Sequence, residues 1–442
     1  MKFVSTRNSK NSADFEKAVL DCLPSDGGLY VPEITADLRR WILYADSNTS
    51  FANIAGTLTS ACINDEFSPI ICETIASKAF TFTPEVKKID ERFYSLKLYN
   101  TPTGSHKDFG ISFLVNCIET IHALNGGFST FLDATVGELG ASLAQFLRGK
   151  KHVKAVFVYP KGMVRGLEES DFVWNGGNIL PVEVDGTEAD CHKIVREIFD
   201  DRQLVENFHL TVANTANIGR LMPQLFFYPY AFTRLKKEVY SDIYYAMPCG
   251  NYSNLVAGLY SWRLSLPVNG FICPTTASLV LDPTGLCSVP DDMVPFEKRS
   301  RSDPASPSNL ERLEDIFSRN SLMLKNFVYP ADVSDFEADE ACRELFMKYS
   351  IFADKNTSGA YAAIKKRREF LEEDDSTVVL IERDDPSLST EYVRHTTGIA
   401  PQMGKNVEKA LSEVKLNQKT VKETKEIVDL MKKFCGFDSG HN

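Results

Sequence analysis

The 442-residue sequence lacks the features that mark several classes of protein. It has no C-x-x-C pair, no block of lysine and arginine, no internal repeat and no apolar stretch that approaches membrane-spanning length. The N-terminal segment "MKFVSTRNSKNSADFEKAVL" also lacks the apolar core of a signal peptide. These absences argue against paired-cysteine redox or metal motifs, a solenoid and a membrane protein.

Cysteine itself is not scarce, because ten cysteines are scattered along the chain. Several of them, such as Cys117 and Cys273, lie inside apolar runs. That placement is typical of buried free thiols in a reducing compartment. We therefore expect a cytoplasmic protein that neither spans nor is anchored to a membrane.

Negative charge exceeds positive charge, with 60 Asp and Glu against 49 Lys and Arg and a formal net charge of −11. This balance argues against a nucleic-acid-binding surface. A local pocket can still bind small anions, because net charge says little about one cleft. The hydrophobic content of 43% suits a large core, and the length predicts two or three domains.

An alternation of strands and helices begins near residue 128, after a first segment of mainly helical pattern. Apolar runs rich in β-branched and aromatic residues predict strands over 129–135, 153–160, 242–249 and 268–275. Helices are expected between them, for example over 137–150, 166–177 and 253–266. The alternation predicts an α/β fold with open, mostly parallel sheets flanked by helices.

The segment "MPCGNYSNLVAGL", residues 247–259, runs from an expected strand through a Gly, Asn and Ser turn into a helix. Backbone N–H groups at such a helix N-terminus can bind an anion, and Gly250 permits close approach of the backbone. Ser253 and Asn254 can either add donors to that site or cap the helix. An ordinary strand–helix turn with a capped helix fits the pattern as well.

The segment "YNTPTGSHKDFG", residues 99–110, places Lys107 at the start of an apolar helix. A lysine is a poor structural choice there, because the helix dipole disfavours positive charge at its N-terminus. The position suits a reactive amine that forms a Schiff base. Alternatively, Lys107 points to water and Asp108 serves as an acid of the first helical turn.

Taken together, these segments resemble the threonine synthase family. "NTPTGSHKDFG" is similar to the family motif H-G-P-T-x-x-F-K-D, and "CGNYSN" is similar to G-N-F-G-N. The stretch "FVSTRN…LPSDGGLYVPE" resembles the family's opening segment, and "DKNTSGAYAA" at 354–363 resembles its D-P-H-T-A region. The motifs occur in the family's order along most of the chain, which is more specific than any one of them.

The resemblance implies a fold-type II enzyme that uses pyridoxal 5′-phosphate (PLP), with two open sheets and an N-terminal segment. It implies an N-terminal domain over 1–95 and a smaller, mobile domain over 96–235 that carries the lysine motif and the substrate loop. A large domain over 236–442, with C-terminal helices, would bind the PLP phosphate. The expected assembly is a monomer or a homodimer.

The resemblance also implies the roles of individual residues. Lys107 would hold PLP as a Schiff base and act as the catalytic base, and Thr357 would face the pyridine nitrogen. The phosphate would be bound by Gly250, Asn251, Tyr252, Ser253 and Asn254. The substrate side would comprise Thr103, Thr135, Gly137, Glu138, Asn214, Asn217 and Arg220. No metal is expected.

The implied reaction converts O-phospho-L-homoserine, a phosphorylated amino acid, and water into L-threonine and phosphate. The segment "TVGELGAS", residues 135–142, departs from the family's T-S-G-D-T-G-S-A at Val136, Glu138 and Leu139. These changes leave open an elimination or replacement reaction on another substituted amino acid. A weakly active binding protein with the same fold is a third possibility.

Other departures lie around the lysine. Asn100 and Thr101 replace the family's His and Gly, and His106 replaces the Phe before the lysine. His106 could add an acid–base group, or it could simply pack where the Phe would. The second Gly of the phosphate loop is Ser253, and "DDPSLSTEYVRHTTG" stands where the family has H-P-A-K-F.

Overall fold

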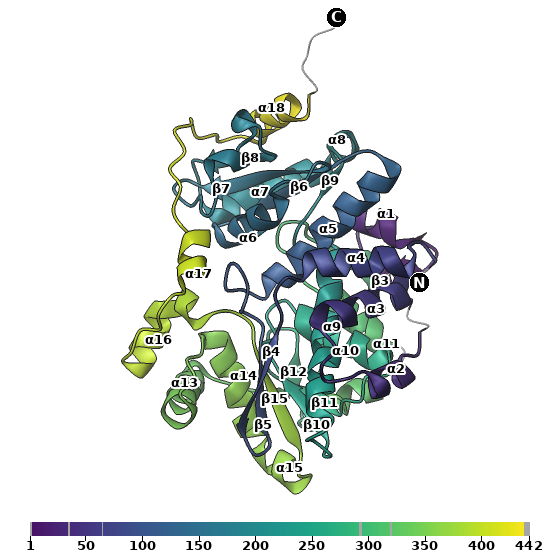
Figure 1. Ribbon diagram of the computed structural model, residues 1–442, viewed down its shortest axis with the longest axis vertical. Coiled ribbons are helices and arrows are strands. Elements are labelled where there is room, and N and C mark those ends of the chain that lie inside the picture. The colour runs from purple at the N-terminus through teal and green to yellow at the C-terminus, as the bar shows by residue number, and fades with distance from the viewer. Residues whose placement is uncertain (1, 34–35, 64, 291–293, 319–320, 437–442) are drawn as a thin grey trace, which may run out of the picture.

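The computed structural model describes residues 2–33, 36–63, 65–290, 294–318 and 321–436. Two sheets lie along the long axis of the molecule, each with helices on both faces (Figure 1). The strands within these two sheets are parallel except for one edge pair. The predicted α/β class is therefore confirmed.

Two strands of the six-stranded sheet are followed by loops that line a cavity between the sheets. Its order is β14 (Val328–Ala331), β11 (Gly270–Pro274), β10 (Ile243–Ala246), β15 (Thr377–Glu382), β5 (Phe93–Lys97) and β4 (Glu85–Asp90), with only β4 antiparallel. Strands β10 and β15 are buried along their whole length. Their apolar side chains point to both faces, so both faces need helical cover. Helices α10 (Ser253–Arg263) and α14 (Lys355–Lys366) provide it on opposite faces.

The four-stranded sheet is wholly parallel, in the order β8 (Ile179–Val184), β7 (Val153–Pro160), β6 (Ser129–Ala134) and β9 (Leu210–Thr211). Helix α6 (Glu138–Leu147) packs on one face, and α7 (Glu188–Asp200) packs on the other. The carboxyl end of β6 leads directly into the 135–142 segment, so that segment lies at the carboxyl edge of the sheet.

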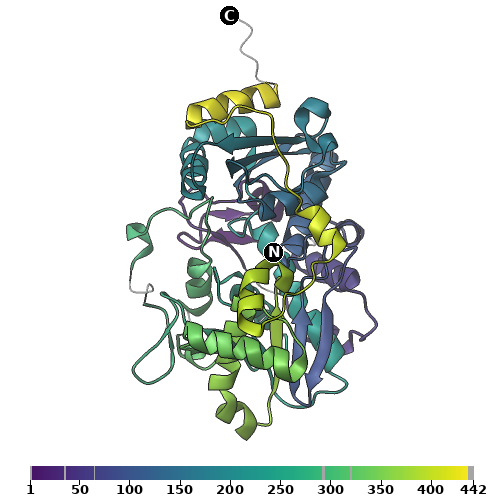
Figure 2. The same ribbon diagram turned by 90° about the vertical axis from the view of Figure 1, so that its left-hand side faces the viewer.

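The C-terminal helix lies on the four-stranded sheet. Helix α18 (Thr424–Cys435) buries Ile427 and Met431 in the same apolar cluster as α7, and Figure 2 shows it at the top of the molecule beside that sheet. The helix thus packs on the four-stranded sheet, and the extents of the three expected domains stay a prediction. Its amphipathic pattern fits either sheet, so the sequence could not tell which one it covers.

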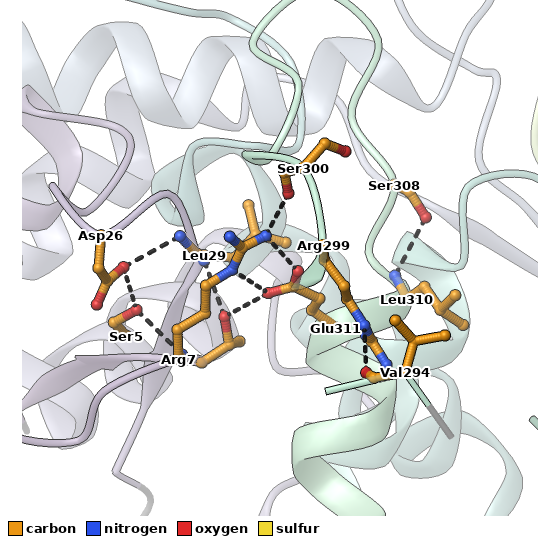
Figure 3. Close-up of polar contacts among 12 residues, drawn as sticks. Ser5, Arg7, Asp26, Leu29, Val294, Arg299, Ser300, Ser308, Leu310 and Glu311 are labelled. Atoms are coloured by element: carbon orange, nitrogen blue, oxygen red, sulfur yellow. Dashed lines mark hydrogen bonds and ion pairs between the residues drawn. The ribbon is translucent and has the colours of Figure 1, made fainter. Parts of the chain in front are cut away.

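The N-terminal segment forms a small antiparallel sheet of β2 (Ser12–Ala13), β1 (Phe3–Ser5) and β3 (Tyr30–Pro32). The segment is tied to the distant helix α11 (Leu310–Ser318), because Arg7 Nη2 lies 2.7 Å from Glu311 Oε1 and 2.5 Å from the Ser300 carbonyl oxygen (Figure 3). Thr6 donates a further hydrogen bond to Glu311 at 2.8 Å. The loop that precedes α11 is thereby held against the N-terminal sheet.

Arg312 on α11 carries this connection into the interior. Its side chain is fully buried and donates to the carbonyl oxygens of Tyr30 and Ala216, each at 2.9 Å. A buried guanidinium needs such acceptors, because burial without them is costly. Arg312 therefore joins the N-terminal sheet to the segment just before helix α9 (Ile218–Leu235).

Helices α5 (Lys107–Asn125) and α9 lie between the two sheets and pack closely against each other. The two helices are close at Gly110, where a Cβ atom would overlap Arg220 Nη1 and lie 2.5 Å from the Arg220 carbonyl oxygen. Aromatic rings of Phe51, Phe109 and Phe227 join the same core, with centroids 5.1–6.0 Å apart. The glycine therefore fixes how closely Arg220 approaches the lysine helix.

The expected helix over 166–177 is wrong. The segment contains two short 3₁₀ helices, η1 (Glu169–Asp171) and η2 (Val173–Asn175). The buried Asp171 carboxylate accepts from Arg148 and from the backbone N–H of Glu168, and these bonds favour a tight turn.

The remaining elements complete the layers around the sheets. The described residues contain no helix that is long and apolar enough to cross a membrane. The other helices are α1 (Phe15–Leu20), α2 (Arg39–Tyr44), α3 (Phe51–Ile63), α4 (Pro69–Ala79), α8 (Arg202–Phe208), α12 (Ser321–Lys325), α13 (Asp335–Tyr349), α15 (Arg368–Glu373), α16 (Thr390–Thr397) and α17 (Lys405–Ala410), with the strands β12 (Val280–Leu281) and β13 (Cys287–Ser288) and the 3₁₀ turns η4 (Phe296–Lys298) and η5 (Pro386–Ser389).

Gly110→Ala tests the packing of α5 on α9. The added methyl group would collide with Arg220, so we expect a loss of about 1–3 kcal/mol in the free energy of unfolding, measured by urea denaturation. Gly359→Ala on α14 is the matched control, because its Cβ would meet only Pro274 Cγ at 3.6 Å. Equal stabilities of the two variants would contradict this account of the helix contact.

Asp133 at the end of β6 makes stability depend on pH. Burial raises the pKa of this carboxyl to about 7, although the Ala213 backbone N–H and Arg220 oppose the change. The folded state thus holds the proton more tightly than the unfolded state, so the free energy of unfolding falls as pH rises from about 4 to 7.

Asp133→Asn removes this titration, while an amide oxygen can still accept from Ala213 at about the observed 2.9 Å. We expect the stability of the variant relative to the parent protein to increase between pH 5 and pH 8, by roughly 2–4 kcal/mol in all. Urea unfolding across this range measures the difference. Asp200→Asn is the control, because it changes an exposed acid on a helix that packs on the same sheet. If the free energies of unfolding of Asp133→Asn and of the parent protein change with pH in parallel, Asp133 is not the cause of the pH dependence.

Candidate active site

A cavity of about 540 Å³ opens between the two sheets at the carboxyl ends of β6, β10 and β15. Ligands of open α/β folds bind at such strand ends. The cavity is lined by Lys107 at the start of α5 and by residues that follow strands of both sheets, including Thr135, Asn251 and Arg383. The lysine segment and the turn after β10, which lie about 140 residues apart in the sequence, therefore face one space.

Lys107 is the first residue of α5, and its side chain is 35% exposed. Its Nζ atom lies 3.1 Å from Glu138 Oε2 at the start of α6. This ion pair joins the lysine helix to the helix that follows the 135–142 segment. The lysine thus points into the cavity and not into bulk solvent.

Asp108 does not act as an exposed acid of the first helical turn. Its carboxylate is buried and accepts from the Thr103 backbone N–H at 2.8 Å, from Thr103 Oγ1 at 2.7 Å and from Ser142 Oγ. Burial raises the pKa of Asp108, while these donors oppose the change. Asp108 therefore holds the turn before Lys107 against α6, and Thr103, a predicted substrate residue, is used in this bond and does not line the cavity.

The turn after β10 has the geometry expected of an anion site. Gly250 has φ +48° and Tyr252 has φ +66°, and α10 begins immediately afterwards at Ser253. Asn251 and Ser253 line the cavity. Tyr252 is buried, and its hydroxyl lies 2.6 Å from Thr276 Oγ1, so its side chain packs behind the turn. Among the described residues, the buried Asn254 amide has no partner for either polar atom.

Residues 214–224 contribute a polar wall. Asn214 and Arg220 line the cavity, whereas Asn217 is fully buried and caps α9 by accepting from the Gly219 N–H at 2.9 Å. Burial lowers the pKa of Arg220 to about 10, opposed by Asp108, Asp384 and Asp133. Its Nε and Nη1 atoms are buried without partners among the described residues. Gln224, one turn further along α9, is also buried, lines the cavity and has an unpartnered amide.

The 135–142 segment curls over the cavity. Thr135 Oγ1 accepts from the backbone N–H groups of Gly137 at 3.0 Å and Gly140 at 3.2 Å, which fixes the turn. Gly137 needs its glycine, because its φ is +119°. Val136, Glu138 and Leu139, three of the positions that depart from the family motif, line the cavity and face the ligand space.

At the start of α14, the predicted Thr357 is buried and does not line the cavity. Its backbone N–H donates to Asp354 Oδ1 at 2.6 Å, and Asp354 caps the helix. The cavity wall here consists of Asp354 and Asn356. The partner of a pyridine nitrogen therefore stays a prediction at this turn.

The cavity lining includes residues that were not predicted from the sequence, among them Arg383 and Asp384 after β15 and Gln224 on α9. Asp384 Oδ1 lies 3.1 Å from His106 Nδ1. Arg383 Nη1 lies 3.2 Å from the position of a Cβ atom on Gly250, and its buried Nε has no partner among the described residues. The sequence shows that the H-P-A-K-F motif is missing from this stretch. It does not show that Arg383 and Asp384 reach the cavity.

These donors suit pyridoxal phosphate. A primary amine, an anion-binding helix N-terminus with a glycine at positive φ, and a nearby guanidinium lie around one cavity. The unpartnered buried groups of Arg220 and Gln224, which line the cavity, are also explained by a polar ligand, since buried polar groups in proteins are normally paired. The residues present therefore fit the expected cofactor.

Known proteins match the chain along nearly its whole length. Residues 78–382 match the family described as pyridoxal-phosphate dependent enzymes, and residues 2–80 match the threonine synthase N terminus. Threonine synthase of Buchnera aphidicola subsp. Acyrthosiphon pisum is 32% identical over 377 residues, covering 84% of this chain and 87% of that protein. Threonine synthase of Escherichia coli is 30% identical over 368 residues, covering 83% and 85%.

Solved structures agree with these matches. The crystal structure of threonine synthase from Escherichia coli has a TM-score of 0.77 at 26% identity and covers 98% of this chain and 100% of its own. PLP-bound threonine synthase from Brucella melitensis has the same fold, with a TM-score of 0.80 at 18% identity and coverage of 98% and 99%. The chain belongs to the threonine synthase family of pyridoxal-phosphate dependent enzymes.

Proposed function

We propose that this chain converts O-phospho-L-homoserine and water into L-threonine and phosphate, as a PLP-dependent lyase in which Lys107 carries the cofactor. The observation that carries the proposal is the meeting of Lys107, the turn after β10 and Arg220 in one cavity. The family to which the chain belongs, and the names of its relatives, support the same reaction.

The chain supplies a binding group for each part of the cofactor and substrate. Lys107 Nζ would carry the aldehyde carbon, and the backbone of residues 250–254 with the α10 N-terminus would bind the phosphate. Arg383 adds a positive charge beside Gly250. Arg220, whose Nε and Nη1 are unpartnered, suits an anionic group of the substrate. Pyridoxal phosphate, when bound, withdraws electrons and acidifies the C–H bonds near the substrate's amino group.

Lys107 is placed to move protons on the substrate carbons. Its Nζ can take a proton from Cα and later from Cβ, and it can return protons to Cγ and Cα. Glu138, 3.1 Å away, stabilises the ammonium form between these transfers. Phosphate departs from Cγ with the electron pair of the C–O bond, and water adds at Cβ.

The altered 135–142 segment changes how the substrate is held. Val136 and Leu139 line the cavity where the family has hydroxyl groups, so these positions give no hydrogen bonds to a phosphate. Side-chain donors that face the same space include Arg220, Asn214 and Ser253. We therefore propose that anion recognition here depends more on Arg220 than on the loop.

We place the reaction in the cytoplasm. All ten cysteines have free thiols, and nine of them are buried, which fits a reducing compartment. A monomer or a homodimer is our expectation for the assembly.

The purified protein should be yellow, and borohydride reduction should fix the cofactor to the peptide that contains Lys107. Mass spectrometry of the digested protein locates the label. Lys107→Ala should remain unlabelled, whereas Lys151→Ala, which removes an exposed lysine outside the cavity, should be labelled normally. A protein that stays colourless when PLP is added would refute the assignment of the cofactor.

Incubation with O-phospho-L-homoserine should release phosphate and L-threonine in equal amounts, because one water replaces one phosphate. A phosphate assay combined with amino-acid chromatography measures both products. Lys107→Ala should lower the rate by at least about 10³-fold, since it removes the amine that binds the cofactor and moves the protons. Phosphate with only 2-oxobutyrate would identify an eliminating enzyme, and no phosphate at all would exclude the proposed reaction.

A further inference from the structure

Two departures from the family motifs touch each other in the cavity wall. His106 replaces the Phe before the lysine, and Asp384 lies in the stretch that replaces H-P-A-K-F. The two segments are about 280 residues apart, yet His106 Nδ1 lies 3.1 Å from Asp384 Oδ1, and both residues line the cavity. A simple packing replacement for Phe would not need a carboxylate beside it.

The pair is held rigidly. Asp384 also accepts from Ser105 Oγ at 2.5 Å, and the backbone N–H of His106 donates to the Arg383 carbonyl oxygen at 2.8 Å. A second backbone bond runs from the Asp385 N–H to the Gly104 carbonyl oxygen at 2.7 Å. The imidazole ring is only 8% exposed, so it has little freedom to turn away from Asp384.

Asp384 determines which ring nitrogen of His106 carries the proton. A carboxylate needs a donor, so Nδ1 carries the proton and Nε2 is left as an acceptor. Nε2 has no hydrogen bond to any residue in the described part of the chain. Burial, the charge of Arg383 on the same loop and that of Arg220 on α9 lower the pKa of His106 to about 4 against the opposing effect of Asp384.

Asp384 stays ionised. Burial alone would raise the pKa of Asp384, but His106, Lys107 and Arg383 outweigh burial and hold the pKa below its usual range. A neutral imidazole beside an ionised carboxylate keeps a free lone pair on Nε2, and Asp384 partly offsets the effect of burial on the imidazolium. The site therefore contains a second proton acceptor next to Lys107.

The proposed reaction needs such an acceptor for one proton. The protons that leave Cα and Cβ are balanced by those that arrive at Cγ and Cα, so one amine can exchange them in turn. The proton of the added water is outside this exchange. Lys107 is paired with Glu138 and exchanges the carbon-bound protons, so His106 Nε2 beside it is free to take the proton of the water.

We infer that His106 Nε2 is the base for the water that adds at Cβ, with Asp384 as its positioning residue. The water oxygen forms the bond to Cβ with its own electron pair, and its proton passes to Nε2. The imidazolium then releases this proton to the phosphate ion already freed from Cγ or to solvent. This role rests on the proposed function.

His106→Phe tests the inference, because it restores the residue that the family has at this position and removes only the base. Release of phosphate precedes hydration, so we expect phosphate to form while threonine falls by about 10²-fold relative to phosphate. The missing product should appear as 2-oxobutyrate and ammonia. His106→Asn, which can still donate to Asp384, should behave in the same way if the Phe variant does not fold.

His122→Phe is the matched control, because His122 is equally buried but bonds to Ser129 Oγ and the Gly126 carbonyl oxygen outside the cavity. It should keep the parent ratio of threonine to phosphate. An unchanged ratio in His106→Phe, with the cofactor spectrum intact, would overturn the inference and leave His106 as a packing residue. No phosphate from the parent protein would instead refute the proposed function, and this inference with it.

A second measurement does not depend on turnover. Nitrogen-15 NMR of the histidine-labelled holoenzyme should show His106 protonated at Nδ1 and bare at Nε2 at pH 7. Asp384→Asn should lose this tautomer preference and shift the threonine-to-phosphate ratio in the same direction as His106→Phe. A ring protonated at Nε2, or on both nitrogens, would contradict the assigned role.

Discussion

The site depends on a backbone junction between the lysine turn and the end of β15. Strand β5 pairs in parallel with β15, and the Leu98 N–H continues this pairing by donating to the Glu382 carbonyl oxygen at 2.8 Å. The chain then turns, and residues 104–106 exchange two further backbone bonds with 383–385. Because backbone bonds in a buried region are strongly retained, Lys107 begins its helix at one defined place above the sheet.

This junction explains why an unfavourable charge is tolerated at a helix start. The α5 dipole disfavours the Lys107 ammonium, but Glu138 and Asp384 place negative charge close to it. Asp108 cannot help, because its carboxylate is bonded to Thr103 and Ser142. The lysine is thus held by groups from two other chain segments, Glu138 after β6 and Asp384 after β15, and both residues also line the cavity.

Much of the fold and part of the cavity could be predicted from local sequence. The strand–helix alternation identified the α/β class, and the lysine motif and the glycine turn identified two segments that the fold brings together. Thr103, Asn217 and Tyr252 were placed in the site by resemblance, but their side chains turn into the structure because Asp108, the α9 N-terminus and Thr276 bond them there. Asp384 could not be found, since its role depends on a contact with His106 across about 280 residues. The position of α18 escaped prediction for the same reason.

The central claim is that Lys107 and the turn after β10 hold the two ends of one cofactor. A crystal structure of the protein with pyridoxal phosphate tests this most directly. The account predicts continuous density from Lys107 Nζ to the cofactor, with the phosphate on the backbone of residues 250–254 at the start of α10. Density that joins the cofactor to another lysine, or a phosphate bound away from this turn, would contradict it.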